Sequence, residues 1–156
     1  MSDYTIILVG ENNLTRSILA EAILKKIFQQ KNIENVNIIS RGSIVLFSEP
    51  ISPKASAVLY EHGCEDVTRR STELTQEDVD DADLILTMST SDTDHIREHF
   101  DLGNTTCMFL GTFIDMEEEI PDVTEDTKEG YETCYQLTKQ AMEAAADRLI
   151  LELITP

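Results

Sequence analysis

Short apolar runs rich in β-branched residues alternate with segments of helical periodicity along this chain, and this alternation constrains the fold most strongly. Four such runs, at residues 4–9, 36–40, 84–88 and 106–110, have the length and composition of strands. Each is followed, directly or after a loop, by apolar residues spaced as on one buried helix face. Strands that alternate with helices favour a parallel sheet. We therefore expect an α/β fold with a four-stranded parallel sheet covered by helices on both faces.

The first three expected helices have sequence signals at their ends. The first opens directly from the loop after the first strand and runs from Arg16 to about Gln30. A second begins near Pro53 and ends at Gly63, since proline suits the first turn of a helix and glycine suits its end. Thr75 is placed to cap a short third helix, with Asp78 three residues later.

The second half of the chain contains two further helices and a long loop. Ser89 or Ser91 can cap the helix that carries Ile96. We expect an ordered surface loop over residues 111–126 and a long final helix from about residue 127 to residue 153. Because the chain has no internal repeat and no linker, we expect a single domain over residues 1–156.

The charge of the chain narrows its choice of partners. Thirty acidic residues against twelve basic ones give a formal net charge of −18, which repels nucleic acids and anionic membranes. A basic or neutral partner is favoured instead. No stretch approaches the roughly eighteen apolar residues of a membrane helix, so we expect a cytoplasmic protein that binds neither nucleic acid nor membrane.

Neither the cysteines nor the histidines suggest a metal or redox site. The cysteines are odd in number and far apart, which predicts buried thiols rather than disulfides or a C-x-x-C site: Cys64, Cys107 and Cys134. His62 is isolated, and His95 and His99 have helical spacing without the glutamate of a zincin motif, so a solvated helix face is favoured. We expect no metal and no cofactor.

The loop after the first strand is the best candidate for a binding site. It reads Gly10-Glu11-Asn12-Asn13-Leu14-Thr15-Arg16-Ser17. Open α/β sheets bind ligands beyond the carboxyl ends of their strands, and backbone amides at a helix N-terminus suit an anion. Arg16 adds a forked cation that matches phosphate or sulfate. An ordinary first-turn salt bridge would use the same residue, so the loop alone leaves both interpretations open.

The same loop and the helix after it carry a family motif. The low-molecular-weight protein tyrosine phosphatases have V-C-x-G-N-x-C-R-S-P after their first strand, followed by a helix with A-E. This chain resembles them with V-G-E-N-N-L-T-R-S-I at residues 9–18, then Ala20 and Glu21. Further similar segments are S-R-G at 40–42, A-V-L at 57–59, H-G at 62–63, L-T-Q-E-D at 74–78, A-D-L-I-L-T-M at 82–88 and I-P-D at 120–122, with Tyr131 after it. The resemblance covers nearly the whole chain and implies a three-layer fold with sheet order 2-1-3-4.

The resemblance also implies roles for individual residues. In that family a cysteine thiolate attacks phosphorus, an arginine and the loop amides hold the phosphoryl oxygens, and an aspartate protonates the leaving group. Arg16 matches the phosphate-binding arginine and Asp122 the general acid. Asn13 matches the asparagine that braces the loop, and Ser17 the hydroxyl beside the arginine. The nucleophile position is Gly10, which has no side chain, so the thiol chemistry of the family is impossible there.

Other departures from the family pattern surround the same site. Thr15 replaces the second cysteine, and no histidine or lysine is nearby in sequence to activate its hydroxyl. Further replacements are Glu11, Asn12, Ile18 and Val123, and Thr124 and Glu125 stand where aromatic residues are expected. Since Glu11 offsets the attraction that Arg16 exerts on an anion, we expect bound phosphate or sulfate to be weak or absent.

These observations support several hypotheses. The first is a pseudophosphatase that binds a phosphorylated or basic protein partner through the surface around residues 10–17, where the family has its active site. The alternative is a phosphoester hydrolase with cysteine-independent chemistry, in which Asp122 or Glu11 activates water against an ester held by Arg16. Arsenate reduction lacks the cysteine that it requires in the loop, and a purely structural role stays open. The surviving residues also suit plain structural roles: Asn13 in a left-handed turn, Ser17 as a cap and Asp122 as a solvated carboxylate.

Overall fold

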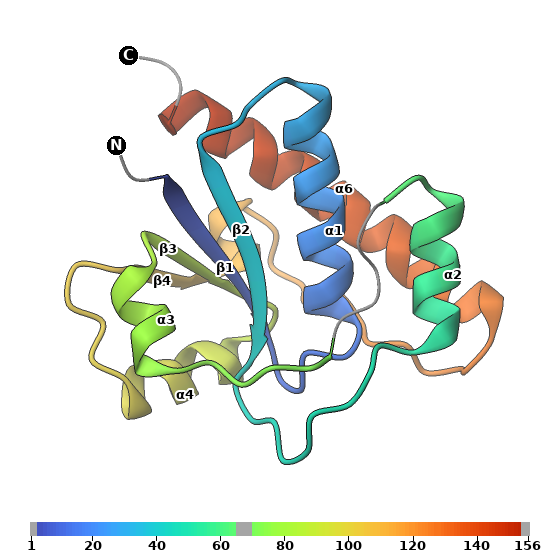
Figure 1. Ribbon diagram of the computed structural model, residues 1–156, viewed down its shortest axis with the longest axis horizontal. Helices are drawn as coiled ribbons and strands as arrows, with labels where there is room; N and C mark the ends of the chain where they lie inside the picture. The colour runs from blue at the N-terminus through green and yellow to red at the C-terminus, as the bar shows by residue number, and fades with distance from the viewer. Residues whose placement is uncertain (1–2, 65–69, 154–156) are drawn as a thin grey trace.

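A four-stranded parallel sheet lies at the centre of the protein, as the computed structural model of residues 3–64 and 70–153 shows (Figure 1). The strands are β1 (Tyr4–Gly10), β2 (Val36–Gly42), β3 (Leu84–Thr87) and β4 (Thr106–Phe109). They lie in the order β2-β1-β3-β4, and all three neighbouring pairs are parallel. The predicted four-stranded sheet in the order 2-1-3-4 is therefore confirmed.

Helices cover both faces of this sheet. They are α1 (Arg16–Gln30), α2 (Pro53–Glu61), α3 (Gln76–Asp81), α4 (Thr90–His99), α5 (Leu110–Phe113) and α6 (Lys128–Leu153). Figure 1 shows α1, α2 and α6 on one side of the sheet and α3 and α4 on the other. The three-layer arrangement is the predicted one.

Strand β1 contributes to both cores because its side chains alternate between the two faces. Ile6 and Leu8 belong to the larger core, which contains side chains of α1, α2 and α6. Ile7 and Val9 belong to the smaller core, where they meet residues of α3 and α4. All four side chains are fully buried. A continuous apolar run is therefore what a central strand of a doubly covered sheet requires.

The register of the strands brings three loops to one edge of the sheet. Val9 pairs with Arg41 of β2 and with Thr87 of β3. Thr87 in turn pairs with Phe109 of β4. Since all strands are parallel, their carboxyl ends meet at this edge, and the loop before α1 lies beside the loop before α2. A binding site at the ends of the strands would be built from these loops.

Most of the predicted boundaries agree with the structure, and their signals are visible. Thr75 and Asp78 form the predicted capping box at the start of α3. Ser89, rather than Ser91, caps α4 by accepting from the backbone of the third helical residue. The second helix ends at Glu61, and Gly63 follows with a φ of 73°, the left-handed conformation that commonly closes a helix.

The prediction of an uninterrupted loop over residues 111–126 is wrong at its start. Strand β4 stops at Phe109, and the next residues form the one-turn helix α5. Leu110 and Phe113 lie one turn apart and are both buried in the larger core. Gly111 packs so closely against the Phe109 ring and the Met116 carbonyl that a side chain would collide there. Burial of this turn, rather than helix propensity, accounts for the difference.

The cysteines and histidines are placed largely as expected. All three cysteines are free and buried. His95 and His99 stack with ring centroids 4.2 Å apart on α4, and His99 is exposed. Within residues 3–64 and 70–153, no group of three or more potential ligands is placed to bind a metal ion. None of the helices in these two ranges is both long and apolar enough to cross a membrane.

Candidate functional site

The candidate loop, residues 10–17, joins the end of β1 to the first turn of α1. Thr15 stands at the N-cap position, but its side chain makes no capping hydrogen bond. The first turn of a helix leaves backbone amides without intrahelical partners, and here that turn opens at the carboxyl edge of the sheet. The backbone therefore has the predicted strand, loop and helix arrangement.

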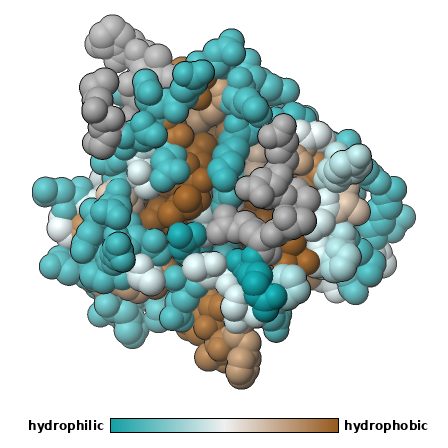
Figure 2. Space-filling model, viewed as in Figure 1, coloured by the Kyte–Doolittle hydropathy of each residue, from teal (hydrophilic) through white to brown (hydrophobic). Residues whose placement is uncertain are grey.

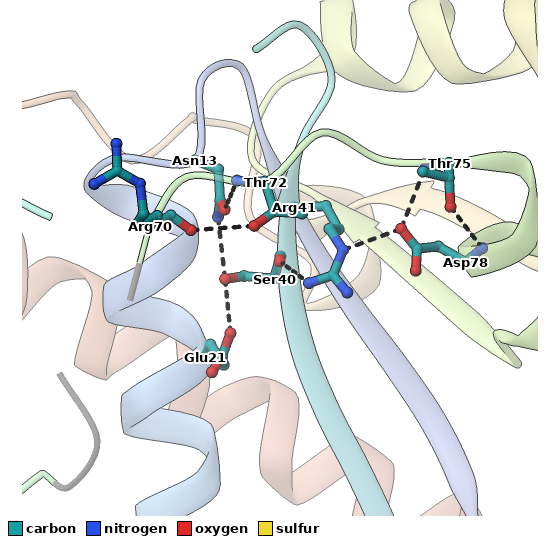
Figure 3. A network of polar contacts seen from close by, with 8 residues as sticks. All are labelled: Asn13, Glu21, Ser40, Arg41, Arg70, Thr72, Thr75 and Asp78. Carbon is teal, nitrogen blue, oxygen red and sulfur yellow. Dashed lines mark hydrogen bonds and ion pairs between the residues drawn. The ribbon is translucent and has the colours of Figure 1, made fainter. Parts of the chain in front are cut away.

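Asn13 holds the loop in shape from within. It has a φ of 56° and is only 1% exposed. Its Nδ2 donates to Ser17 Oγ at 2.9 Å. As Figure 3 shows, Nδ2 also donates to Ser40 Oγ, at 3.1 Å, and Oδ1 accepts from the backbone N–H of Thr72 at 2.9 Å. One amide side chain thus ties the loop to α1, to the end of β2 and to the segment before α3. The predicted left-handed turn at Asn13 is confirmed.

We call the hydrogen bonds of Asn13 to Ser17, Ser40 and Thr72 the Asn13 brace. The contacts of Ser40 extend this brace into the protein. Its hydroxyl donates to Glu21 Oε1 at 2.7 Å, and the other carboxylate oxygen of Glu21 accepts from Lys25 at 2.8 Å. Arg41 bonds to the Ser40 carbonyl at 2.8 Å and to Asp78 at 3.0 Å, which Figure 3 shows as a continuous path toward α3. A buried carboxylate is costly unless it is paired, and here it is paired.

Gly10 stands at the position where the phosphatase family that this chain resembles has its nucleophile, and it lies beside Ser17. A Cβ on Gly10 would lie 3.2 Å from Ser17 Oγ and 3.8 Å from the Ser17 backbone nitrogen. The positive-φ glycines among the described residues are others, so the backbone at Gly10 does not require glycine. Because residue 10 is glycine, no side chain from this position faces the start of α1. Ser17 does not act as the helix cap but accepts from Asn13.

Arg16 and Asp122, the two candidate catalytic residues, lie close together although they are far apart in the sequence. Arg16 Nη1 donates to the carbonyl of Ile120 at 3.1 Å, and Arg16 Nε lies 3.9 Å from Asp122 Oδ1. The arginine side chain is 15% exposed and the aspartate side chain 55% exposed. The guanidinium is therefore held against residues 120–122, while much of the carboxylate faces water. Such a distant, half-solvated ion pair contributes little to stability.

The part of the loop that faces solvent carries one carboxylate. Glu11 and Asn12 are both exposed. The Glu11 carbonyl accepts from the backbone N–H of Ile44 at 2.9 Å, which joins this loop to the one after β2. Asn12 Oδ1 accepts from the backbone N–H of Leu14 at 3.2 Å, a turn of the kind that asparagine favours.

Two cavities are lined in part by residues of the candidate site. One, of about 360 Å³, is lined by Glu11, Asn12 and Leu14 on one side and by residues 44–47 and Glu49 on the other. The second, of about 300 Å³, lies between residues 121–125 and α6. Thr124 and Glu125, at the positions where the family has aromatic residues, line this second cavity.

None of the three cysteines is an activated thiolate. Burial raises the pKa of Cys64, and it raises that of Cys107 to about 11. Cys134 lines the second cavity, where burial and then the negative charge of Asp122 raise its pKa, although a hydrogen bond to Thr138 and the charge of Arg16 oppose them. Since the thiolate is the reactive form, these side chains are poor nucleophiles near neutral pH.

The brace contains residues that the sequence did not single out as site residues. Ser40 and Glu21 stand in the S-R-G and A-E segments, so the motif pointed to them without a role. Thr72 donates its backbone N–H to Asn13, and the sequence does not indicate which backbone groups will form such bonds.

Comparison with known proteins agrees with the geometry. The family model described as "Low molecular weight phosphotyrosine protein phosphatase" matches residues 5–153. The low molecular weight protein-tyrosine-phosphatase PtpB of Staphylococcus aureus is 32% identical over 131 residues, which are 84% of this chain and 88% of that protein. The probable low molecular weight protein-tyrosine-phosphatase EpsP of Ralstonia solanacearum is 27% identical over 93% of this chain and 95% of its own.

Solved structures extend this likeness to the fold. The YwlE arginine phosphatase from Geobacillus stearothermophilus has a TM-score of 0.83 at 27% identity, covering 97% of this chain and 96% of that one. Wzb of Vibrio vulnificus, solved in complex with benzylphosphonate, has a TM-score of 0.79 at 27% identity and covers 94% and 99%.

Proposed function

The chain belongs to the low molecular weight phosphotyrosine protein phosphatase family, and on that premise we propose that it is a pseudophosphatase. In this proposal the domain keeps the phosphate-loop architecture, performs no thiol-dependent hydrolysis, and binds a phosphorylated or basic protein through the face around the loop. The observation that supports it most directly is Gly10, where the side chain beside the start of α1 is missing.

Thiol-dependent hydrolysis needs a nucleophile at that position. It proceeds when a thiolate forms a bond to phosphorus while the ester oxygen leaves with a proton. Glycine offers no atom for this step. Thr15 makes no side-chain hydrogen bond to a base among the described residues, and the three cysteines are buried with raised pKa values. Each substitute for the nucleophile is therefore unsuited to the reaction.

A binding role is supported by the intact brace. The side chain of Asn13 keeps its three hydrogen bonds, so the loop has a fixed shape without the nucleophile. Arg16, the cation that would meet a phosphoryl group, is held by the Ile120 carbonyl and faces Asp122. An anion must compete with these contacts and with the nearby Glu11 carboxylate, so we propose only weak phosphate or sulfate binding.

A second candidate is a phosphoester hydrolase with cysteine-independent chemistry. The closeness of Asp122 to Arg16 favours it, because a carboxylate near a phosphate-holding arginine could take a proton from an attacking water. Water oxygen would bond to phosphorus as Asp122 took its proton, the ester bond would break, and the same proton would pass from Asp122 to the leaving alkoxide.

An assay of aryl phosphate hydrolysis combined with thermal unfolding separates these functions. We expect no phosphate release above the protein-free rate. In thermal unfolding with phosphate, sulfate or vanadate, we expect a small stabilisation that disappears in Arg16→Ala and persists in Lys139→Ala, which removes an exposed positive charge on α6. Hydrolysis that is lost in both Arg16→Ala and Asp122→Asn would overturn the pseudophosphatase and support the hydrolase.

A further inference from the structure

An apolar loop projects from the protein beside the candidate site. Residues 44–47 read Ile-Val-Leu-Phe, and the side chains of Leu46 and Phe47 are 82% and 80% exposed. Figure 1 shows this loop between β2 and α2, and Figure 2 shows apolar atoms projecting there from a mostly hydrophilic surface. Adjacent large apolar side chains held in water commonly mark an interaction surface.

The loop is fixed at both of its ends. At the start, the backbone N–H of Ile44 donates to the Glu11 carbonyl at 2.9 Å. At the end, the backbone N–H of Glu49 donates to Ser71 Oγ at 2.8 Å, and Ser48 Oγ donates to the Ser71 carbonyl at 2.9 Å. The exposed tip of the loop is therefore held in place by hydrogen bonds at both ends. A partner that binds it loses little free energy to ordering the loop.

A groove runs between this loop and the candidate site. It is the cavity of about 360 Å³ whose walls are Glu11, Asn12 and Leu14 on one side and residues 44–47 with Glu49 on the other. Its lining is apolar except for Asn12 and the two carboxylates. Glu73 lies against the same loop, since its Oε1 accepts from the backbone N–H of Val45 at 3.1 Å.

The charges of the residues that line the groove favour one kind of occupant, although the Arg70 guanidinium lies nearby, bonded to Ser48. No arginine or lysine is among the described residues that line it, whereas Glu11 and Glu49 are. With a net charge of −18, the chain repels a second copy of itself and anionic membranes, and of the two kinds of partner proposed above it favours the basic one over the phosphorylated one. A positively charged partner would be attracted at long range and would find apolar surface to bury once docked.

We propose that this groove docks an unphosphorylated segment of a partner protein that carries an apolar anchor flanked by lysine or arginine. Leu46 and Phe47 cover the anchor, and the carboxylates of Glu11 and Glu49 pair with the flanking cations. The inference rests on the proposed pseudophosphatase function and deepens it. It assigns the basic partner to the groove between residues 11–14 and residues 44–49, rather than to the backbone amides and Arg16 that would bind a phosphate.

Fluorescence anisotropy with designed peptides tests this docking. The probe is a short labelled peptide with a Leu-Phe anchor between lysine and arginine residues. It is compared with a version whose basic residues are glutamate, one whose anchor is serine, and one that adds phosphotyrosine. We expect the basic apolar peptide to bind most tightly, and Leu46→Ser with Phe47→Ser to weaken it at least about tenfold.

Matched variants separate the groove from general effects of charge and apolar surface. Glu11→Gln with Glu49→Gln should weaken binding and reduce its salt dependence. Leu151→Ser and Glu143→Gln, which change exposed residues of α6, should leave binding unchanged. Thermal unfolding of each variant checks that the fold is retained. Equal binding of all four peptides, tighter binding of the phosphotyrosine or glutamate version, or equal loss in the α6 variants would overturn the proposal.

Two further outcomes would replace the proposed occupant. Sedimentation that reveals a dimer dispersed by Leu46→Ser would assign the surface to a second copy, and binding to anionic vesicles would assign it to a membrane. Aryl phosphate hydrolysis measured on the same samples keeps the proposals apart. Hydrolysis would overturn the pseudophosphatase, whereas absence of peptide discrimination without hydrolysis would overturn the docking alone.

Discussion

The hydroxyl of Ser17 lies beside Gly10, 3.2 Å from where a Cβ of that residue would be. This contact is tight, because Ser17 Oγ and Ser17 Cβ would lie 3.2 and 3.3 Å from the added atom, but the Gly10 backbone does not require glycine. The backbone at the start of α1 is also near, since the Ser17 backbone nitrogen would lie 3.8 Å from the same Cβ. A cysteine can therefore be placed here with little rearrangement, next to amides that stabilise a thiolate.

Gly10→Cys should consequently fold and carry a reactive thiol. We expect its Tm to remain within about 5 °C of the parent protein. We expect this thiol to react with iodoacetamide below pH 8, because a helix N-terminus lowers the pKa of a nearby cysteine. Mass spectrometry of the labelled peptide gives the site. A thiol at residue 10 that reacts no faster than the native ones would mean that the helix end does not act on this position.

The native cysteines should react slowly while the protein is folded. Burial raises the pKa of all three, in the case of Cys107 to about 11. We expect a disulfide reagent such as DTNB at pH 8 to modify few thiols in the folded protein and all three in urea. Rapid modification of one thiol without denaturant would show that its surroundings open readily.

Asn13→Ala should destabilise the protein considerably. Alanine is disfavoured at a φ of 56° by about 1 to 2 kcal/mol, and three hydrogen bonds of a buried group are lost as well. We expect the free energy of unfolding in urea to fall by about 2 to 4 kcal/mol. Asn13→Gly relieves the backbone and isolates the hydrogen bonds. The exposed Asn12→Ala is the matched control, and an equal effect there would contradict the central role of Asn13.

The contact between His62 and Glu132 should make stability depend on acid pH. His62 Nε2 lies 2.8 Å from Glu132 Oε1, and the ring stacks on Tyr135 at 3.9 Å. Burial alone would raise the pKa of Glu132, but hydrogen bonds from Gln136 and His62 and the positive charges nearby lower it below the ordinary 4.5. A lowered pKa means that the stabilisation is present above pH 4.5 and is lost as the pH falls through the value in the folded protein.

Glu132→Gln measures this contribution. We expect the variant to be less stable than the parent above about pH 5 and the difference to shrink below pH 4, as followed by urea unfolding across that range. Glu143→Gln, at an exposed position of the same helix, should not change the pH profile. A difference that is constant with pH would mean that the charge of Glu132 is not what stabilises the fold.

The sequence predicted those features whose signals lie within a few residues of one another. The first strand, its loop and α1 follow from one apolar run and one helical stripe, and the cap of α3 follows from the spacing of Thr75 and Asp78. The left-handed turn at Asn13 was predicted for the same reason, because asparagine tolerates that conformation.

Features that depend on distant contacts were not predictable in this way. Helix α5 has a single turn, too short for periodicity to mark, and it exists because its residues are buried. The motif associated Arg16 with Asp122, but the hydrogen bond from Arg16 to the carbonyl of Ile120 depends on how a chain segment 104 residues away is folded. The hydrogen bond from the Thr72 amide to Asn13 was not predictable either, because any residue except proline offers a backbone N–H.

The Asn13 brace has a consequence for how this loop can change. Its hydrogen bonds run through Asn13, Ser17, Ser40 and Glu21, and none involves a side chain at residue 10. The hydrogen bonds that shape the loop therefore do not depend on which side chain stands at residue 10. For the experimenter, residue 10 becomes a position at which a small side chain, such as that of cysteine, can be introduced while these hydrogen bonds are kept.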